Sequence, residues 1–177
     1  MPRALAIIGL VVALGALSAF AAYDRAPSPA WQEIAWPFPR DGWPAGRAFR
    51  CGDARCAGLE VYVRPKIGFC NCDAGVADDD EVDRVADIDL ISPRFAPLAA
   101  GTTVLLADMA GRVRAYQLQM ADEARRVAVG IAVSHRCDLF VAVAQGAGTA
   151  SEIQLMAATL IETNEIRQWV RTAMQMR

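Results

Sequence analysis

Lysine and histidine are almost missing from this chain of 177 residues, since each occurs once, as Lys66 and His135. A single histidine leaves one possible base for a serine–histidine–aspartate triad, and no G-x-S-x-G segment supplies its nucleophile. The G-x-x-x-x-G-K-[ST] and G-x-G-x-x-G phosphate-binding patterns and a Cys-x-x-Cys motif are also absent. The formal net charge of −2 argues against nucleic acid as a partner, because such proteins need a strongly basic surface.

An uncharged apolar run follows Arg3 and extends through residues 4–22. A membrane-spanning helix needs about 20 apolar residues, whereas the core of a cleavable signal peptide has roughly 7–15. Residues 19–21 (Ala-Phe-Ala) have the form of a cleavage site, so a removed leader is the alternative to a retained anchor. We favour a single-pass anchor in the inner membrane with the remainder in the periplasm. Both interpretations predict that residues 23–177 are exported.

Residues 23–47 are rich in proline and tryptophan and are interpreted as a linker. Proline blocks regular helix and keeps a chain extended, while the rings present large apolar surfaces. Three interpretations of Trp31, Trp36 and Trp43 remain open. The rings rest at the membrane interface, pack on the chain's own domain, or bind a protein partner in the cell envelope.

Residues 48–177 are expected to form one exported α+β domain, a small mixed β-sheet covered by three helices. Alternating residues predict a strand over 59–67 that Pro65 confines to an edge or ends early. A hairpin is expected over 101–118, with Gly111 supplying a positive φ in its turn. A helix is expected over 121–135, followed by a strand over 138–144 that is buried on both faces.

Two helices are expected at the C-terminal end. Thr149 and Glu152 have the spacing of a capping box, which satisfies free backbone amides at a helix start. Apolar residues follow at helical spacing from Ile153 onward. Thr163 or Asn164 is expected to cap the second helix.

Four of the five cysteines cluster as Cys51, Cys56, Cys70 and Cys72. In an oxidising compartment disulfides are the default, and a Cys70–Cys72 bond would close a very small ring. We therefore expect bonds between the two segments, each closing a loop of about 15 residues and contributing about 3 kcal/mol in the chain-entropy model. This pairing leaves Cys137 over.

A copper or zinc site formed by Cys70 and Cys72, with Cys51 and Cys56, is the alternative, because thiolates bind both metals. His135 is a further possible ligand, although a histidine near a helix end commonly complements the helix dipole. The second cysteine pair lacks the usual zinc spacing. A thiol–disulfide oxidoreductase is less favoured still.

An acidic run that includes Asp78, Asp79 and Asp80 follows the second cysteine pair. Nearby negative charge raises the pKa of a thiol, which disfavours a reactive nucleophile. The acids are expected in a solvated loop or at a helix N-terminus, and they also offer a docking face to a basic partner. The sequence thus predicts a membrane-tethered, disulfide-stabilised binding or assembly module that needs no cofactor.

Overall fold

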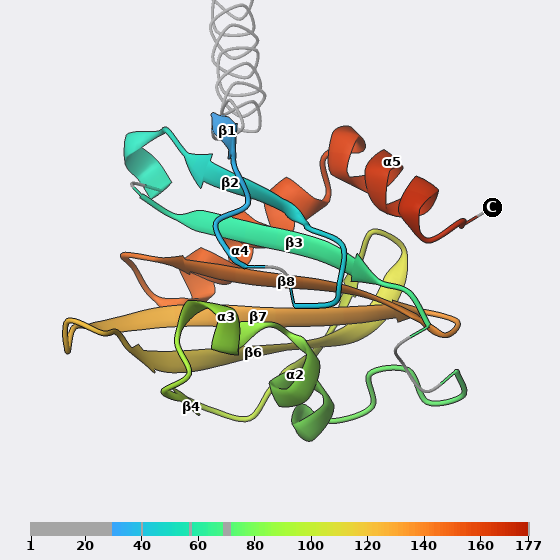
Figure 1. The fold of residues 1–177 in the computed structure, drawn as a ribbon, viewed down its shortest axis with the longest axis horizontal. Helices are drawn as coiled ribbons and strands as arrows, with labels where there is room; N and C mark the ends of the chain where they lie inside the picture. The colour runs from blue at the N-terminus through green and yellow to red at the C-terminus, as the bar shows by residue number, and fades with distance from the viewer. Residues whose placement is uncertain (1–29, 40, 57, 69–71, 177) are drawn as a thin grey trace, which may run out of the picture.

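An eight-stranded antiparallel sheet dominates the molecule (Figure 1). The structure is a computed structural model that describes residues 30–39, 41–56, 58–68 and 72–176. The strands are β1 (Trp31–Ile34), β2 (Arg47–Cys51), β3 (Glu60–Lys66), β4 (Phe95–Pro97), β5 (Thr102–Leu106), β6 (Met109–Gln119), β7 (Arg125–His135) and β8 (Asp138–Gly146). Their order in the sheet is β1-β2-β3-β8-β7-β6-β4, and β5 also pairs with β6. The expected small mixed sheet is therefore wrong, because the sheet is large and its pairings are antiparallel.

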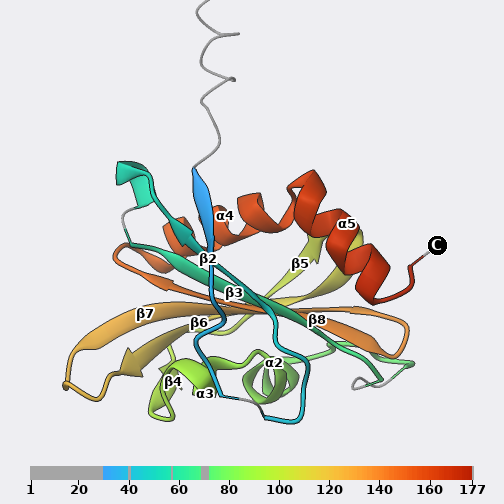
Figure 2. The same cartoon turned by 45° about the horizontal axis from the view of Figure 1, so that its top comes forward.

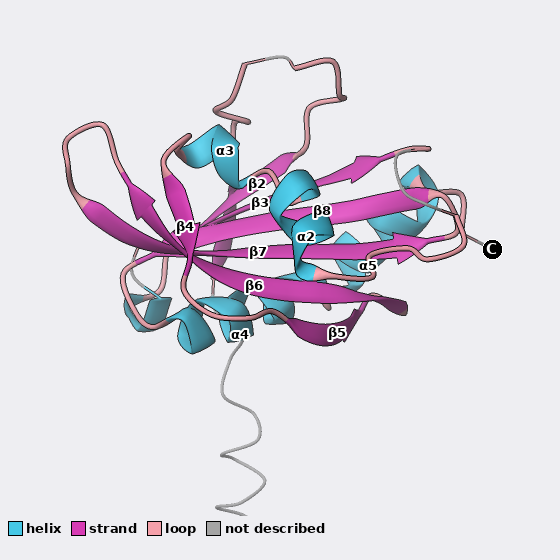
Figure 3. Cartoon of the chain, turned by 90° about the horizontal axis from the view of Figure 1, so that it is seen from below, coloured by secondary structure: helices cyan, strands magenta, loops and turns pink. Residues whose placement is uncertain are grey.

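Helices cover both faces of this sheet (Figures 2 and 3). They are the short 3-10 helix η1 (Ala54–Cys56), α2 (Asp79–Val85), α3 (Ile88–Ile91), α4 (Ala150–Ile161) and α5 (Asn164–Ala173). Helices α4 and α5 pack on one face, over an apolar cluster that includes Val61, Phe140 and Ile153. Helices α2 and α3 pack on the opposite face, over a second cluster that includes Tyr116 and Val141.

The helix expected over 121–135 is wrong, because this segment is the long strand β7. It pairs with β6 along one side and with β8 along the other, so both of its edges are satisfied. Its β-branched residues fit a pleated surface better than a helix. Gly130 would weaken a helix interior, and in the sheet it leaves room for Ala86 and Ile88, against which a Cβ would press.

The expected hairpin is formed by β5 and β6, but its turn differs from the prediction. Ala107 and Asp108 adopt the positive φ values, 50° and 64°, that a two-residue hairpin turn requires. Gly111 instead lies within β6, where a Cβ would collide with the backbone of β7 at Ala132. The glycine serves close packing of two strands.

Strand β3 confirms the strand expected over 59–67, and β8 confirms the buried strand expected over 138–144. Pro65 pairs with Phe140 on β8, whereas the pairing with β2 ends at Val63. The proline therefore lies beyond the reach of β2. An interior strand accommodates it because one side of the strand is locally an edge there.

The two C-terminal helices begin as the sequence predicts. Thr149 and Glu152 form both bonds of a capping box at α4. The Thr163 hydroxyl accepts a hydrogen bond from the amide of Ile166 and caps α5. These local caps fix the starts of the helices that cover the first apolar cluster.

The predicted membrane segment, residues 1–22, lies outside the described residues. Within the described part of the chain, no helix has the length and apolarity needed to cross a bilayer.

Candidate binding surface

The proline- and tryptophan-rich segment folds onto the domain. Its first part is strand β1, which pairs with β2 at the edge of the sheet. We call residues 35–46 the strap, because they run from β1 to β2 over the polar side of β3 (Figure 1). Trp36 packs edge-on against Phe38 and Tyr62, with ring centroids 5.3 and 6.2 Å away.

A glycine at the end of the strap allows this close packing. A Cβ at Gly46 would collide with the carbonyl oxygen of Val63 and with the Trp36 ring. Trp43 lies with its ring 6.0 Å from the ammonium group of Lys66. Trp36 and Trp43 are thus placed on the chain's own domain, and their predicted role in partner binding stays a prediction.

Four polar residues of β3 point to the side covered by the strap. They alternate along the strand with Val61, Val63 and Pro65, and they are Glu60, Tyr62, Arg64 and Lys66. Such alternation is typical of a solvent-facing row, but Arg64 and Lys66 are only 2% and 4% exposed. The sequence did not predict that this row is covered, because no local pattern shows that the strap lies over it.

Arg64 is the centre of a buried ion cluster. Its guanidinium binds both carboxylate oxygens of Asp87 at 2.6 and 2.8 Å and both carboxylate oxygens of Asp41 at 2.9 and 2.7 Å. Lys66 donates to Asp87 at 2.6 Å and to the carbonyl oxygen of Val85 at 2.8 Å. Asp41 belongs to the strap, so this cluster ties the strap to β3 and to the segment between α2 and α3.

The cluster shifts the acidities of its members. The hydrogen bond from Arg64 lowers the pKa of Asp41 to about 2. Burial by itself would lower the pKa of Arg64, but the hydrogen bonds to Asp87 and Asp41 raise it above its ordinary value. Asp87 has a φ of 62°, an uncommon backbone conformation, and its carboxylate is bound by both Arg64 and Lys66.

A second polar group occupies the start of β3. The Tyr62 hydroxyl donates to Glu60, and Arg50 donates to the same carboxylate at 2.7 Å. Burial and the bond to Glu60 raise the pKa of Tyr62 above its ordinary value. The side-chain oxygen of Gln145 is buried beside this group without a hydrogen-bond partner among the described residues. Glu60, Tyr62 and Arg50 bond to one another, which supports a structural role for these three side chains.

Trp31 lies apart from the other two predicted rings. It lines an open cavity of about 240 Å³ between the edge strands and helices α4 and α5, which we call the Trp31 groove. The groove is lined by Trp31, Glu33, Phe49, Thr159, Leu160, Thr163, Glu165 and Ile166. The indole nitrogen of Trp31 is buried and has no hydrogen-bond acceptor in the described part of the chain.

One arginine bridges two carboxylates at the Trp31 groove. Arg47 donates to Glu33 at 2.6 Å and also binds Glu165. The hydrogen bond from Arg47 lowers the pKa of Glu33. The Arg47 guanidinium also stacks over Phe49 at 4.9 Å. The groove therefore combines a largely buried apolar floor with one positive and two negative charges at its rim.

The acidic run is used mainly within the molecule. The Asp78 carboxylate accepts from the amide of Glu81 and caps α2, as the helix-terminus interpretation expected. Asp79 accepts from the amide of Gly101 at 2.9 Å and binds Arg112 at 3.0 Å, contacts that lower its pKa. Asp80 is exposed to solvent. Their predicted docking role remains a prediction.

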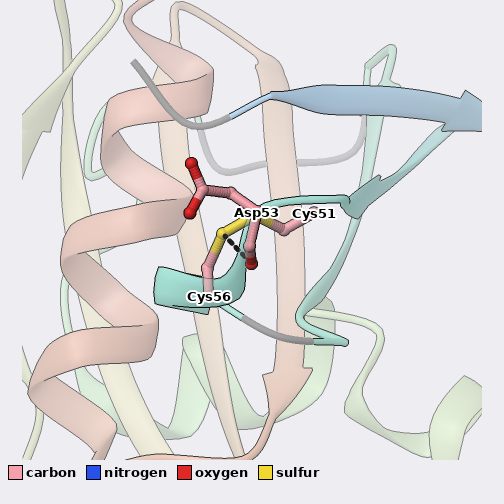
Figure 4. The surroundings of a disulfide bond; sticks show 3 residues. All are labelled: Cys51, Asp53 and Cys56. Carbon is pink, nitrogen blue, oxygen red and sulfur yellow. Dashed lines mark hydrogen bonds between the residues drawn. A yellow bond between two sulfur atoms is a disulfide. The ribbon is translucent and has the colours of Figure 1, made fainter. Parts of the chain in front are cut away.

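The cysteines pair differently from the expectation. Cys51 bonds to Cys56, with Cα atoms 6.0 Å apart, as Figure 4 shows beside Asp53. Cys72 bonds to Cys137, with Cα atoms 4.2 Å apart. The expected bonds between the two cysteine segments are wrong because β3 separates them by about 20 Å, at about 3.3 Å per strand residue. Cys70 lies outside the described residues.

This pairing bears on the metal alternative. Cys51, Cys56 and Cys72 are bonded to sulfur and present no free thiolate, the form that binds copper or zinc. His135 ends β7, where it pairs with Asp138 across a tight turn. Within the described ranges, no group of three or more histidine, cysteine, aspartate or glutamate side chains is arranged to hold a metal ion.

No protein-family model matches this chain, and no curated protein matches it either. A crystal structure of a protein of unknown function from Pseudomonas aeruginosa, described as a suggested regulator, is similar over 75% of this chain and 77% of that chain. The sequences are 12% identical and the TM-score is 0.33. A similarity at this level carries no argument about fold or function.

Proposed function

We propose that this chain is a membrane-tethered, exported binding or assembly module, stabilised by disulfides and without catalysis of its own. The two disulfides fit an oxidising compartment such as the periplasm. The proposed partner is a protein of the cell envelope, and the proposed anchor is the apolar segment over residues 4–22.

The Trp31 groove is the observation that carries this proposal. The strap belongs to the folded domain, so only residues 23–30 separate the proposed anchor from β1. A fully extended chain of this length spans at most about 30 Å. The groove beside β1 is therefore held close to the bilayer, where it meets membrane proteins and their exported segments.

The chemistry of the groove suggests what the partner presents. The half-buried Trp31 ring offers apolar contact, and Phe49, Leu160 and Ile166 form a floor beneath it that is only 4%, 3% and 1% exposed. A partner segment with an apolar side chain that packs on the Trp31 ring fits this surface. Arg47 brings one positive charge against the two negative charges of Glu33 and Glu165, so the groove does not favour an acidic ligand.

Site-specific photo-crosslinking in intact cells tests the proposal. A benzophenone side chain at Thr159, inside the groove, should form one discrete adduct with another envelope protein. The same group at Leu105, an exposed residue of β5, is the matched control. Adduct formation at Thr159 should fall at least about tenfold when Trp31→Ala removes the ring, as expected of a central aromatic anchor.

A C-terminal alkaline phosphatase fusion supplies the independent test of export. Phosphatase activity in the membrane fraction is expected. An inactive phosphatase fusion, together with cytosolic fluorescence from a fluorescent protein fused at the same position, would contradict the anchor. Equal adduct formation from Thr159 and Leu105 would contradict the groove alone.

A further inference from the structure

The two disulfides differ in how solvent reaches them. Cys51 and Cys56 are only 4% and 7% exposed and belong to the apolar cluster beneath α4. Cys72 is exposed and Cys137 is half-buried. Thiol–disulfide exchange requires a thiolate to approach one sulfur directly, so burial protects the first bond and leaves the second open to attack.

We infer that the Cys72–Cys137 bond is a reducible site for a protein dithiol, while Cys51–Cys56 stays closed as a structural bond. The inference rests on the disulfides themselves and does not require the partner proposed for the Trp31 groove.

The surface next to Cys137 is hollowed. Cys137 lies in the turn between β7 and β8, and both of its neighbours, Arg136 and Asp138, line a cavity of about 680 Å³. The other side of this cavity is the C-terminal end of α5, and exposed Ile67 lies at its margin. Neither cysteine lines this cavity, so access to the bond rests on the exposure of Cys72, whose sulfur the reductant attacks.

The exchange balances with two electrons from the dithiol. A reductant thiolate attacks Sγ of Cys72, forms a mixed disulfide and releases Cys137 as a thiolate. The second reductant thiol then attacks the mixed disulfide, leaving Cys72 reduced and the reductant oxidised to its disulfide. The two protons of the dithiol end on Cys72 and Cys137.

Opening this bond should loosen one loop and leave the domain folded. The bond joins residues 65 positions apart and fastens the segment between β3 and α2 to the β7–β8 turn. Other contacts hold the same segment, since Gly68 donates its amide to Asp138 at 2.7 Å and Val76 is buried in the second cluster. Reduction therefore gives a local change in the segment that leads into α2.

The test uses the oxidised full chain in detergent with Cys70→Ser, which removes the one cysteine outside these pairs. Reduced thioredoxin is the probe, and alkylation followed by mass spectrometry reports each cysteine. Cys72 and Cys137 should become alkylated at least about tenfold faster than Cys51 and Cys56. Hydrogen exchange should rise within residues 67–78 and stay unchanged in β7 and β8 away from the turn.

Two double variants serve as controls. Cys72→Ser with Cys137→Ser should reproduce the exchange pattern of the reduced protein without any reductant. Cys51→Ser with Cys56→Ser should leave the rate at Cys72 unchanged. Equal rates at both bonds, or resistance of Cys72–Cys137 to thioredoxin until the protein is unfolded in urea, would overturn the inference.

Discussion

The two faces of the sheet are built on different physical principles. Under α4 and α5 the contacts are apolar, and the helices start at caps formed by residues within one turn of each other. Under the strap and α2 an apolar cluster adjoins charged and hydroxyl groups, of which Arg64, Lys66 and Tyr116 bond to carboxylates distant in sequence. The first face tolerates approximate packing, whereas the second depends on every ion finding its partner.

Loss of one ion should therefore damage the second face most. Arg64→Met removes the cation between Asp41 and Asp87 and leaves the buried Asp87 with only Lys66. Removing one partner of a buried pair costs about 3–5 kcal/mol. Urea unfolding followed by tryptophan fluorescence should show this loss.

The matched control is Arg50→Met, which breaks an ion pair whose arginine side chain is 54% exposed. Exposed pairs contribute about 0–1 kcal/mol, so this variant should unfold close to the parent. Similar losses of unfolding free energy in the two variants would show that the Arg64 cluster stabilises the fold no more than an exposed ion pair does.

The same contrast explains which parts of the molecule could be predicted from sequence. The caps at Thr149 and Thr163 and the buried strand β8 depend on neighbouring residues, and each was predicted. The pairing of Cys72 with Cys137 and the Arg64–Asp41 contact join distant segments, and no local pattern announces them.

Strand β7 was predicted wrongly, as a helix, for a different reason. Its alanines and valines fit a helical stripe as well as a strand, so periodicity alone could not decide. The decision comes from β6 and β8, which pair along both of its edges.

For the candidate site, Trp31 was predicted from composition, whereas Phe49, Leu160 and Ile166 could be joined to it only by the fold.

A smaller loss is expected on the apolar face from Thr149→Ala, which removes the side-chain half of the capping box at α4. Loss of such a cap costs about 1 kcal/mol. Urea unfolding is again the measurement, and Thr149→Ser, which keeps the hydroxyl, is the control. A Thr149→Ala loss as large as that of Arg64→Met would contradict the contrast between the faces.

Acid should release the strap before it disturbs the helical face. Asp41 has a pKa of about 2 in the folded protein, below its ordinary value of 3.8, because Arg64 holds its carboxylate. A lowered pKa stabilises the charged form, so this contribution is complete above about pH 4 and is lost as the pH falls towards 2. Protonation of Asp41 weakens its bonds to Arg64, and Trp36 and Trp43, which sit over β3, should then change fluorescence.

Because other carboxylates also titrate in this range, the difference between the parent and Asp41→Asn isolates the strap. The variant should lack the step centred near pH 2, and an identical step in both proteins would show that Asp41 does not hold the strap in place.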